Sequence, residues 1–173
     1  MAKLRPGRCV RRLKRPWMRV SRKKPKKSYV KGVPALRVRR FRTGKEGDYD
    51  LTLKLICESN IQIRDNALEA ARVAISNYLQ KKVKDNFYLV LVKYPFQVIR
   101  EHKQAAVAGA DRYFSGMRHA FGKPSGCAVQ ARKGDCLFEL KIHGKNENFA
   151  MEALRIAKHK LPGSYRVERV VAS

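Results

Sequence analysis

Residues 50–57 read DLTLKLIC and residues 65–82 read DNALEAARVAISNYLQKK. In the first segment Leu51, Leu53 and Leu55 alternate with other residues, which is typical of a strand with one buried face. In the second segment the spacing of apolar residues is that of a helix with one buried stripe. This stripe comprises Leu68, Ala71, Ile75, Tyr78 and Leu79. The pair predicts a strand followed by a helix that packs on the same sheet.

The rest of the chain repeats this order. Residues 136–143 (CLFELKIH) alternate as a second strand, residues 147–161 have the spacing of a second helix, and residues 165–171 predict a closing strand. Two apolar runs, 87–94 and 96–100, flank Pro95 and favour further strands. The predicted fold class is α+β: a two-layer sandwich with two helices on one face of a mainly antiparallel sheet. Asp65 is the predicted N-cap of the first helix.

The charge is concentrated at the N-terminal end. The chain carries 40 Lys and Arg against 14 Asp and Glu, a net charge of +26, and residues 1–45 hold 19 of the basic residues and no acidic one. Such a segment cannot bury enough apolar surface to fold alone, but phosphates neutralise its charge and release their own counterions. We therefore predict a basic RNA-binding arm (1–45) and an α+β body (46–173). The candidate RNA contacts in the arm are Arg5, Arg8, Arg11, Arg12, Lys14, Arg15, Trp17, Arg19, Arg22, Lys23, Lys24, Lys26, Lys27 and Lys31.

A long internal loop is predicted at residues 101–126 (EHKQAAVAGADRYFSGMRHAFGKPSG), where the periodic pattern stops. Loops of this length inside a domain are either functional or disordered. Glycines let a backbone approach a ligand closely, and aromatic and Arg side chains stack on exposed bases. RNA contact is the favoured interpretation, and a surface loop without a partner is the alternative. The residues with suitable chemistry are Gly109, Arg112, Tyr113, Gly116, Arg118, His119, Phe121, Gly122 and Lys123.

Enzyme and metal motifs fail on spacing. A P-loop needs four residues between its glycines and a hydroxyl after its lysine, but Gly116 and Gly122 have five between them and Pro124 follows Lys123. The quartet at 44–47 (GKEG) has the spelling of a KH clamp, yet it follows a strand-like run at 36–42, so a hairpin turn is favoured.

The cysteine and histidine positions also exclude a recognisable site. The four cysteines are scattered without zinc-ligand spacing, which favours a reducing setting, and no histidine pairs with a nucleophile. The sequence predicts no catalytic residue, no metal and no cofactor. Membrane attachment is not expected, because no apolar run reaches the ~18 residues of a spanning helix and no secretory leader is recognisable.

Four blocks of the chain resemble one family. They are YVKGVPALRVRRF (29–41), NALEAARVAISNYL (66–79), YPFQVIREHKQAAVAGADRYFSGMRHAFGKPSG (94–126) and MEALRIAKHKLPG (151–163). In this order they are similar to the archaeal and eukaryotic L10e family of large-subunit ribosomal proteins, whose bacterial counterpart is L16. The block at 108–124 is the most specific, and the resemblance spans nearly the whole chain.

The resemblance implies a structural protein, not an enzyme, that binds ribosomal RNA near the peptidyl-transferase centre and the A-site tRNA. It implies neighbouring ribosomal proteins as further partners and a cytoplasmic location in the ribosome. By position it implies RNA contacts at Lys103, Arg112, Arg118 and Lys123, with residues 103–113 directed toward the tRNA ends. His119 and the very basic arm depart from the family pattern. The end at Ser173, without the longer extension of eukaryotic members, favours an archaeal form.

Two other classes of protein stay open at this point. A free-standing RNA-binding module or RNA chaperone would share the basic arm. An RNA-modifying enzyme would need a cofactor or a catalytic constellation that the sequence does not display.

Overall fold

The computed structural model of the 173-residue chain describes residues 4–13, 30–102, 116–118 and 121–171. In this part of the chain the strands form two separate antiparallel sheets, of five and three strands. The five-stranded sheet has the order β1-β4-β7-β2-β8, and the three-stranded sheet has the order β3-β6-β5. The larger sheet consists of β1 (Arg42–Gly44), β4 (Phe87–Leu91), β7 (Cys136–Ile142), β2 (Leu51–Cys57) and β8 (Tyr165–Val171).

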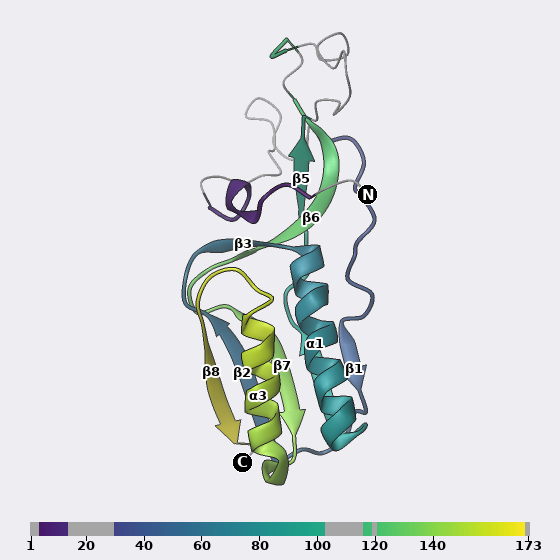
Figure 1. The fold of residues 1–173 in the computed structure, drawn as a ribbon, viewed down its shortest axis with the longest axis vertical. Coiled ribbons are helices and arrows are strands. Elements are labelled where there is room, and N and C mark those ends of the chain that lie inside the picture. The colour runs from purple at the N-terminus through teal and green to yellow at the C-terminus, as the bar shows by residue number, and fades with distance from the viewer. Residues whose placement is uncertain (1–3, 14–29, 103–115, 119–120, 172–173) are drawn as a thin grey trace.

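Two helices, α1 (Asp65–Val83) and α3 (Glu147–Lys158), cover one face of the larger sheet (Figure 1). The predicted α+β sandwich is therefore confirmed, with every strand pair antiparallel. Alternation on β2 buries Leu51, Leu53 and Leu55 against the helices, as predicted. The buried stripes of the helices also match the prediction. They comprise Leu68, Ala71, Ile75 and Leu79 on α1, and Ala150, Ala153, Leu154 and Ala157 on α3.

The three-stranded sheet extends away from the helical half of the molecule (Figure 1). It consists of β3 (Ile61–Arg64), β6 (Lys123–Ala131) and β5 (Gln97–Glu101). We predicted β5 but neither β3 nor β6, and a single sheet in place of two. The four residues of β3 are too few for a periodic pattern, and Pro124 and Gly126 made the start of β6 look like loop.

The internal loop is shorter than the predicted 101–126, because Glu101 ends β5 and residues 123–126 belong to β6. Pro124 lies opposite Arg100, next to a register shift between Ile99 and Arg100. Strand β3 pairs with β6 only at Ala128–Ala131. On that side, no described strand pairs with β6 at Pro124, so the lack of a backbone N–H in proline breaks no hydrogen bond of the sheet there.

Two local predictions were wrong. The strand at 36–42 is only β1, at Arg42–Gly44, and no hairpin turn follows it, because β1 pairs with β4 and not with β2. Arg64 occupies the N-cap position of the first helix without a capping hydrogen bond from its side chain, and Asp65 is the first residue of the helix. The Asp65 carboxylate accepts hydrogen bonds from the backbone N–H groups of Asn66 and, at 3.2 Å, Arg37.

Candidate nucleic-acid interface

The predicted contacts at the start of the arm lie beside the three-stranded sheet. Residues 7–9 form a short 3-10 helix, η1 (Gly7–Cys9), and Arg12 bridges to Ile61 at the start of β3. The backbone N–H of Gln62 donates to the carbonyl of Arg11 at 2.7 Å. Because the backbone is fixed in this way, the side chains face solvent from a defined position. These exposed residues are Arg5, Arg8, Arg11 and Arg12.

The base of the internal loop lies at the far end of β5 and β6. The guanidinium carbon of Arg100 stacks 3.8 Å from the centroid of the Phe121 ring, and His102 Nε2 lies 3.2 Å from the Gly116 carbonyl oxygen. Gly122 is buried here, and a Cβ on it would lie 2.6 Å from the backbone of Glu101. These contacts hold together the two ends from which residues 103–115 depart. Gly122 therefore serves a close internal crossing, and the predicted approach to RNA at this residue stays a prediction.

Three more predicted contacts are exposed on the described part of the chain. Arg118 lies in the turn at 116–118, Lys123 begins β6, and Lys31 lies where the structure resumes after residue 29. The remaining candidates lie outside the described residues and stay predictions. They are Lys14, Arg15, Trp17, Arg19, Arg22, Lys23, Lys24, Lys26, Lys27, Lys103, Arg112 and His119.

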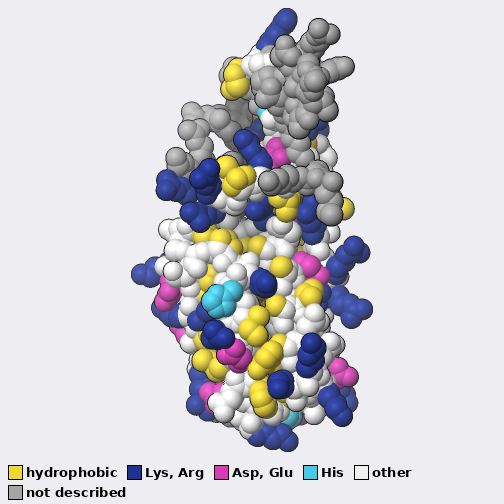
Figure 2. All heavy atoms as spheres, viewed as in Figure 1, with side chains coloured by type: hydrophobic (Ala, Val, Ile, Leu, Met, Phe, Trp, Pro, Cys, Tyr) yellow, Lys and Arg dark blue, Asp and Glu magenta, His cyan; other side chains and the backbone are white. Residues whose placement is uncertain are grey.

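The ion pairs are unevenly distributed over the described residues. All six pairs found there lie on or beside the helices and the five-stranded sheet, as with Glu69–Arg72 and Glu152–Arg155. Figure 2 shows the acidic side chains chiefly over this helical half. Within the described ranges no ion pair engages the exposed cations beside the three-stranded sheet. This unpaired set is Arg5, Arg8, Arg11, Arg12, Arg118 and Lys123, which we call the basic end.

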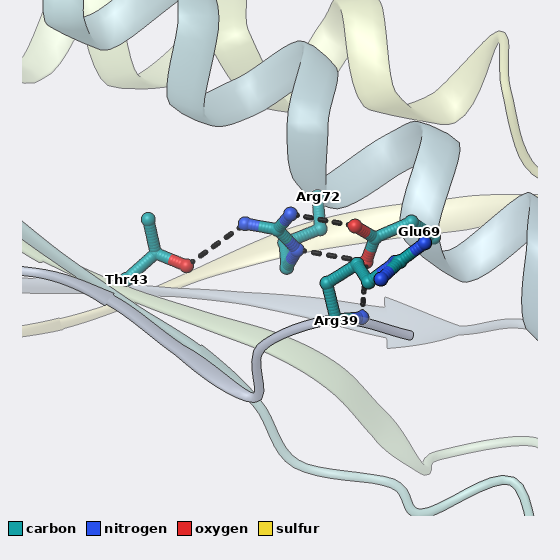
Figure 3. Close-up of polar contacts among 4 residues, drawn as sticks. All are labelled: Arg39, Thr43, Glu69 and Arg72. Carbon is teal, nitrogen blue, oxygen red and sulfur yellow. Dashed lines mark hydrogen bonds and ion pairs between the residues drawn. The ribbon is translucent and has the colours of Figure 1, made fainter. Parts of the chain in front are cut away.

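The described part of the arm after residue 29 is attached to α1. Glu69 accepts two hydrogen bonds from Arg72, at 2.7 and 2.9 Å, and one from the backbone N–H of Arg39 at 3.2 Å. Arg72 also donates to the Thr43 hydroxyl, so one cluster ties β1 and residue 39 to the helix (Figure 3). The bonds from Arg72 hold the pKa of Glu69 below its usual range. Val38 is buried in the main core.

Sequence reasoning missed three basic residues near the basic end. Arg100 lies on β5, Arg64 lies at the junction of β3 and α1, and Lys160 lies just after α3. Nothing in their local sequence distinguishes them from ordinary surface cations. Only the fold brings Arg64 and Lys160 near the arm, where both line the same hollow as Arg11.

Three of the four cysteines have the environment of structural residues, whereas Cys9 is exposed. Burial raises the pKa of the thiols of Cys57, Cys127 and Cys136, which keeps them in the less reactive protonated form. Among the residues described, no cluster of three His, Cys, Asp or Glu side chains could hold a metal ion. No helix in the same part of the chain is long and apolar enough to cross a membrane.

Comparison with known proteins gives consistent matches. The family model described as ribosomal protein L16p/L10e matches residues 17–168. The large ribosomal subunit protein uL16 of Sulfolobus acidocaldarius is 44% identical over 169 residues, covering 95% of this chain and 93% of that protein. The uL16 proteins of Caldivirga maquilingensis and Saccharolobus solfataricus are 42% and 41% identical, each covering 95% of this chain and 94% and 92% of their own lengths. All three relatives are archaeal.

Proposed function

Since the chain belongs to the ribosomal protein L16p/L10e family, we propose that it binds large-subunit ribosomal RNA through its basic end and arm. Family membership makes the chain a structural constituent of the large ribosomal subunit. The observation that supports this binding face is that the exposed cations of the basic end have no acidic partner within the described residues, whereas the ion pairs found there and most acidic side chains lie in the helical half. Unpaired surface cations are free to neutralise phosphates, whereas paired ones must first give up a partner.

The basic arm (1–45) and the body (46–173) have different parts in this proposal, and the last residues of the arm, which include Val38 and β1, pack into the body. The arm carries nearly half of all the basic residues and supplies most of the phosphate contacts. The body sets the direction of the arm, through the anchoring of residues 5–12 on β3 and of residues 37–43 on α1.

The binding face is tested with two variants of equal charge. One replaces Arg5, Arg8, Arg11 and Arg12 with Gln, and the control replaces Lys81, Lys82, Lys84 and Lys145, at the opposite end of the molecule, with Gln (Figure 1). Binding to large-subunit RNA is measured over a series of salt concentrations. Removing one phosphate–cation pair lowers the log–log salt slope by about 0.7–0.9. We expect a lower slope for the arginine variant alone. Equal slopes for the two variants would contradict the proposed face.

A finer part of the proposal concerns the internal loop, which we place near the peptidyl-transferase centre and the A-site tRNA. The resemblance of residues 94–126 to the family supports this placement. The arrangement of the loop base is compatible with it, because Arg100, Phe121 and Gly122 fix where the loop leaves the fold.

The placement of the loop is tested by replacing residues 103–113 with a brief Gly-Ser link. Subunits that lack this protein are reconstituted with either form, and occupancy is measured by mass spectrometry. Dipeptide formation is then measured by rapid quench. We expect normal occupancy with slowed dipeptide formation. Full occupancy with an unimpaired rate would contradict the placement near tRNA.

The two alternatives are distinguished by simple observations. An RNA chaperone would leave the large subunit in a high-salt sucrose gradient, whereas a structural constituent co-sediments with it. An RNA-modifying enzyme requires a catalytic group, and we propose that the chain has none. Alanine at Cys127, Cys136 or His143 should then cost stability at most, with translation unimpaired in variants that fold.

A further inference from the structure

A hollow lies beside the basic end, between η1, the junction of β3 with α1, and the turn that follows α3. Its empty space is about 530 Å³, including the open mouth, and its lining includes Gly7, Arg11, Gln62, Arg64, Lys160 and Pro162. Three segments that are far apart in the sequence form its walls. We call it the Gln62 pocket.

Three cations line the Gln62 pocket. Arg11 and Lys160 are exposed and Arg64 is half-buried, and none of them forms an ion pair within the residues described. Arg64 Nη1 donates to the carbonyl of Arg5 at 2.8 Å, and this bond fixes the guanidinium against the N-terminal segment. A guanidinium has five N–H donors, so donors remain for a ligand. The charge of the pocket selects an anionic group.

Gln62 supplies a second and independent feature. Its side chain is only 1% exposed, and its Nε2 donates to the Val10 carbonyl at 2.9 Å. Its Oε1 is buried and has no hydrogen-bond partner among the described residues. Buried polar atoms are nearly always paired, so this oxygen lacks a donor. Gln62 is part of the pocket lining, but Oε1 itself has less than 1 Å² of accessible surface, so a small donor in the pocket, such as a hydroxyl group, reaches it only when the pocket wall moves aside.

The shape of the pocket depends on a tight turn at its edge. Gly163 has a φ of +92°, and a Cβ on it would lie 2.9 Å from Ile61 Cδ1. Glycine therefore lets the turn after α3 pack closely against the start of β3. This close packing brings Lys160 and Pro162 into the same lining as Arg11.

We propose that the Gln62 pocket holds one ribose–phosphate unit of ribosomal RNA, with the phosphate against Arg11, Arg64 and Lys160 and the ribose 2′-hydroxyl donating to Gln62 Oε1. This inference rests on the proposed RNA binding and adds a reason for a preference for RNA. The 2′-hydroxyl is the group that distinguishes RNA from DNA at a given site. The phosphate contacts provide affinity, and the bond to Gln62 provides the discrimination.

The first test uses the full chain and an RNA fragment of the large subunit that crosslinks to it. The fragment is synthesised with a single 2′-deoxy substitution at each position in turn, and each dissociation constant is measured. For the unaltered chain we expect one position at which the substitution weakens binding about fivefold, the value of one hydrogen bond. In Gln62→Met the same substitution should have no further effect, as in a double-mutant cycle.

The second test does not depend on the fold of the Gln62 variant, in which the bond to Val10 is also removed. Arg11→Gln combined with Lys160→Gln alters exposed side chains only, and Lys81→Gln combined with Lys82→Gln is the control of equal charge. We expect the first pair to lower the log–log salt slope by about 0.7–0.9, the value for a single phosphate, and the control pair to leave it unchanged.

The outcomes separate this inference from the proposed function. If the chain binds the RNA fragment but every 2′-deoxy position is tolerated, or if the penalty persists in Gln62→Met, the pocket does not hold a ribose. An unchanged salt slope in the variant with Arg11→Gln and Lys160→Gln would show that the Gln62 pocket does not bind a phosphate. If the unaltered chain does not prefer the large-subunit fragment to an unrelated RNA of equal length, the proposed function fails as well.

Discussion

At the scale of single residues, acidic side chains hold the basic segments in place. Asp65 and Glu69 lie four residues apart on α1 and accept the backbone N–H groups of Arg37 and Arg39. Arg72 is 8% exposed, and the Glu69 carboxylate forms its charge partner. A carboxylate in this position therefore does two things: it neutralises a buried cation, and it fixes the path by which the arm leaves the body (Figure 3).

The first prediction concerns Glu69. Glu69→Gln removes the charge opposite Arg72 and weakens three hydrogen bonds, so it should lower the free energy of unfolding by about 1–3 kcal/mol. The control is Glu152→Gln, because Glu152 and Arg155 form an ion pair with the same i,i+3 spacing on α3 but are exposed. Urea unfolding measures both variants. A decrease for Glu69→Gln no larger than that for the control would show that the cluster does not stabilise the body.

The second prediction concerns pH. The backbone N–H of Gly144 and the ring of His143 lower the pKa of Asp50 to about 2, from an ordinary value near 3.8. Between these two pKa values the unfolded chain binds more protons than the folded one. The contribution of Asp50 is therefore complete above about pH 4 and is lost as the pH falls toward 2. Asp50→Asn should flatten the pH dependence of stability in this window.

The control for Asp50 is a nearby carboxylate. Asp48 is exposed and takes part in no hydrogen bond or ion pair within the described part of the chain, so Asp48→Asn should keep the full pH dependence. Urea unfolding from pH 5 to pH 2 measures both variants. Identical curves for Asp50→Asn and the unaltered chain would contradict the assignment.

At the scale of elements, sequence patterns predicted the helices and the strand that form the core. They did not predict two strands of the small sheet beside the candidate interface. The stripes of α1, α3 and β2 were predictable, because burial on one face imposes a period on the sequence. Strands β3 and β6 were not, because four residues carry no period and β6 begins with Lys-Pro-Ser-Gly. The basic character of the site was evident, but its position depends on pairings between distant segments, such as Arg12 with Ile61.

The third prediction concerns the base of the internal loop. Gly122→Ala should loosen the crossing of β5 and β6, because the new Cβ would lie 2.6 Å from the Glu101 backbone, which cannot move aside cheaply. Gly126→Ala is the matched control on β6, since a Cβ there meets nothing within 4 Å. Thermal unfolding should show destabilisation for Gly122→Ala alone, typically about 1–3 kcal/mol for overpacking. Equal stability of the two variants would contradict the close crossing.

At the scale of the whole molecule, charge and packing are divided between two halves. The helical half contains most of the main core and all the ion pairs found among the described residues. The half formed by the three-stranded sheet presents unpaired cations and the ends of the internal loop (Figures 1 and 2). At a net charge of +26, the positive side chains of the free chain repel one another. Binding to a polyanion reduces this electrostatic repulsion, which folding alone does not remove.

The central claim is that the basic end and the arm face ribosomal RNA while the helical half does not. Ultraviolet crosslinking of assembled large subunits, followed by mass spectrometry of the peptide–nucleotide adducts, tests it most directly. We predict adducts in residues 4–31 and 100–123, and none at Lys81, Lys82 or Lys145. Adducts confined to the helical half, with the basic end free of them, would contradict the account.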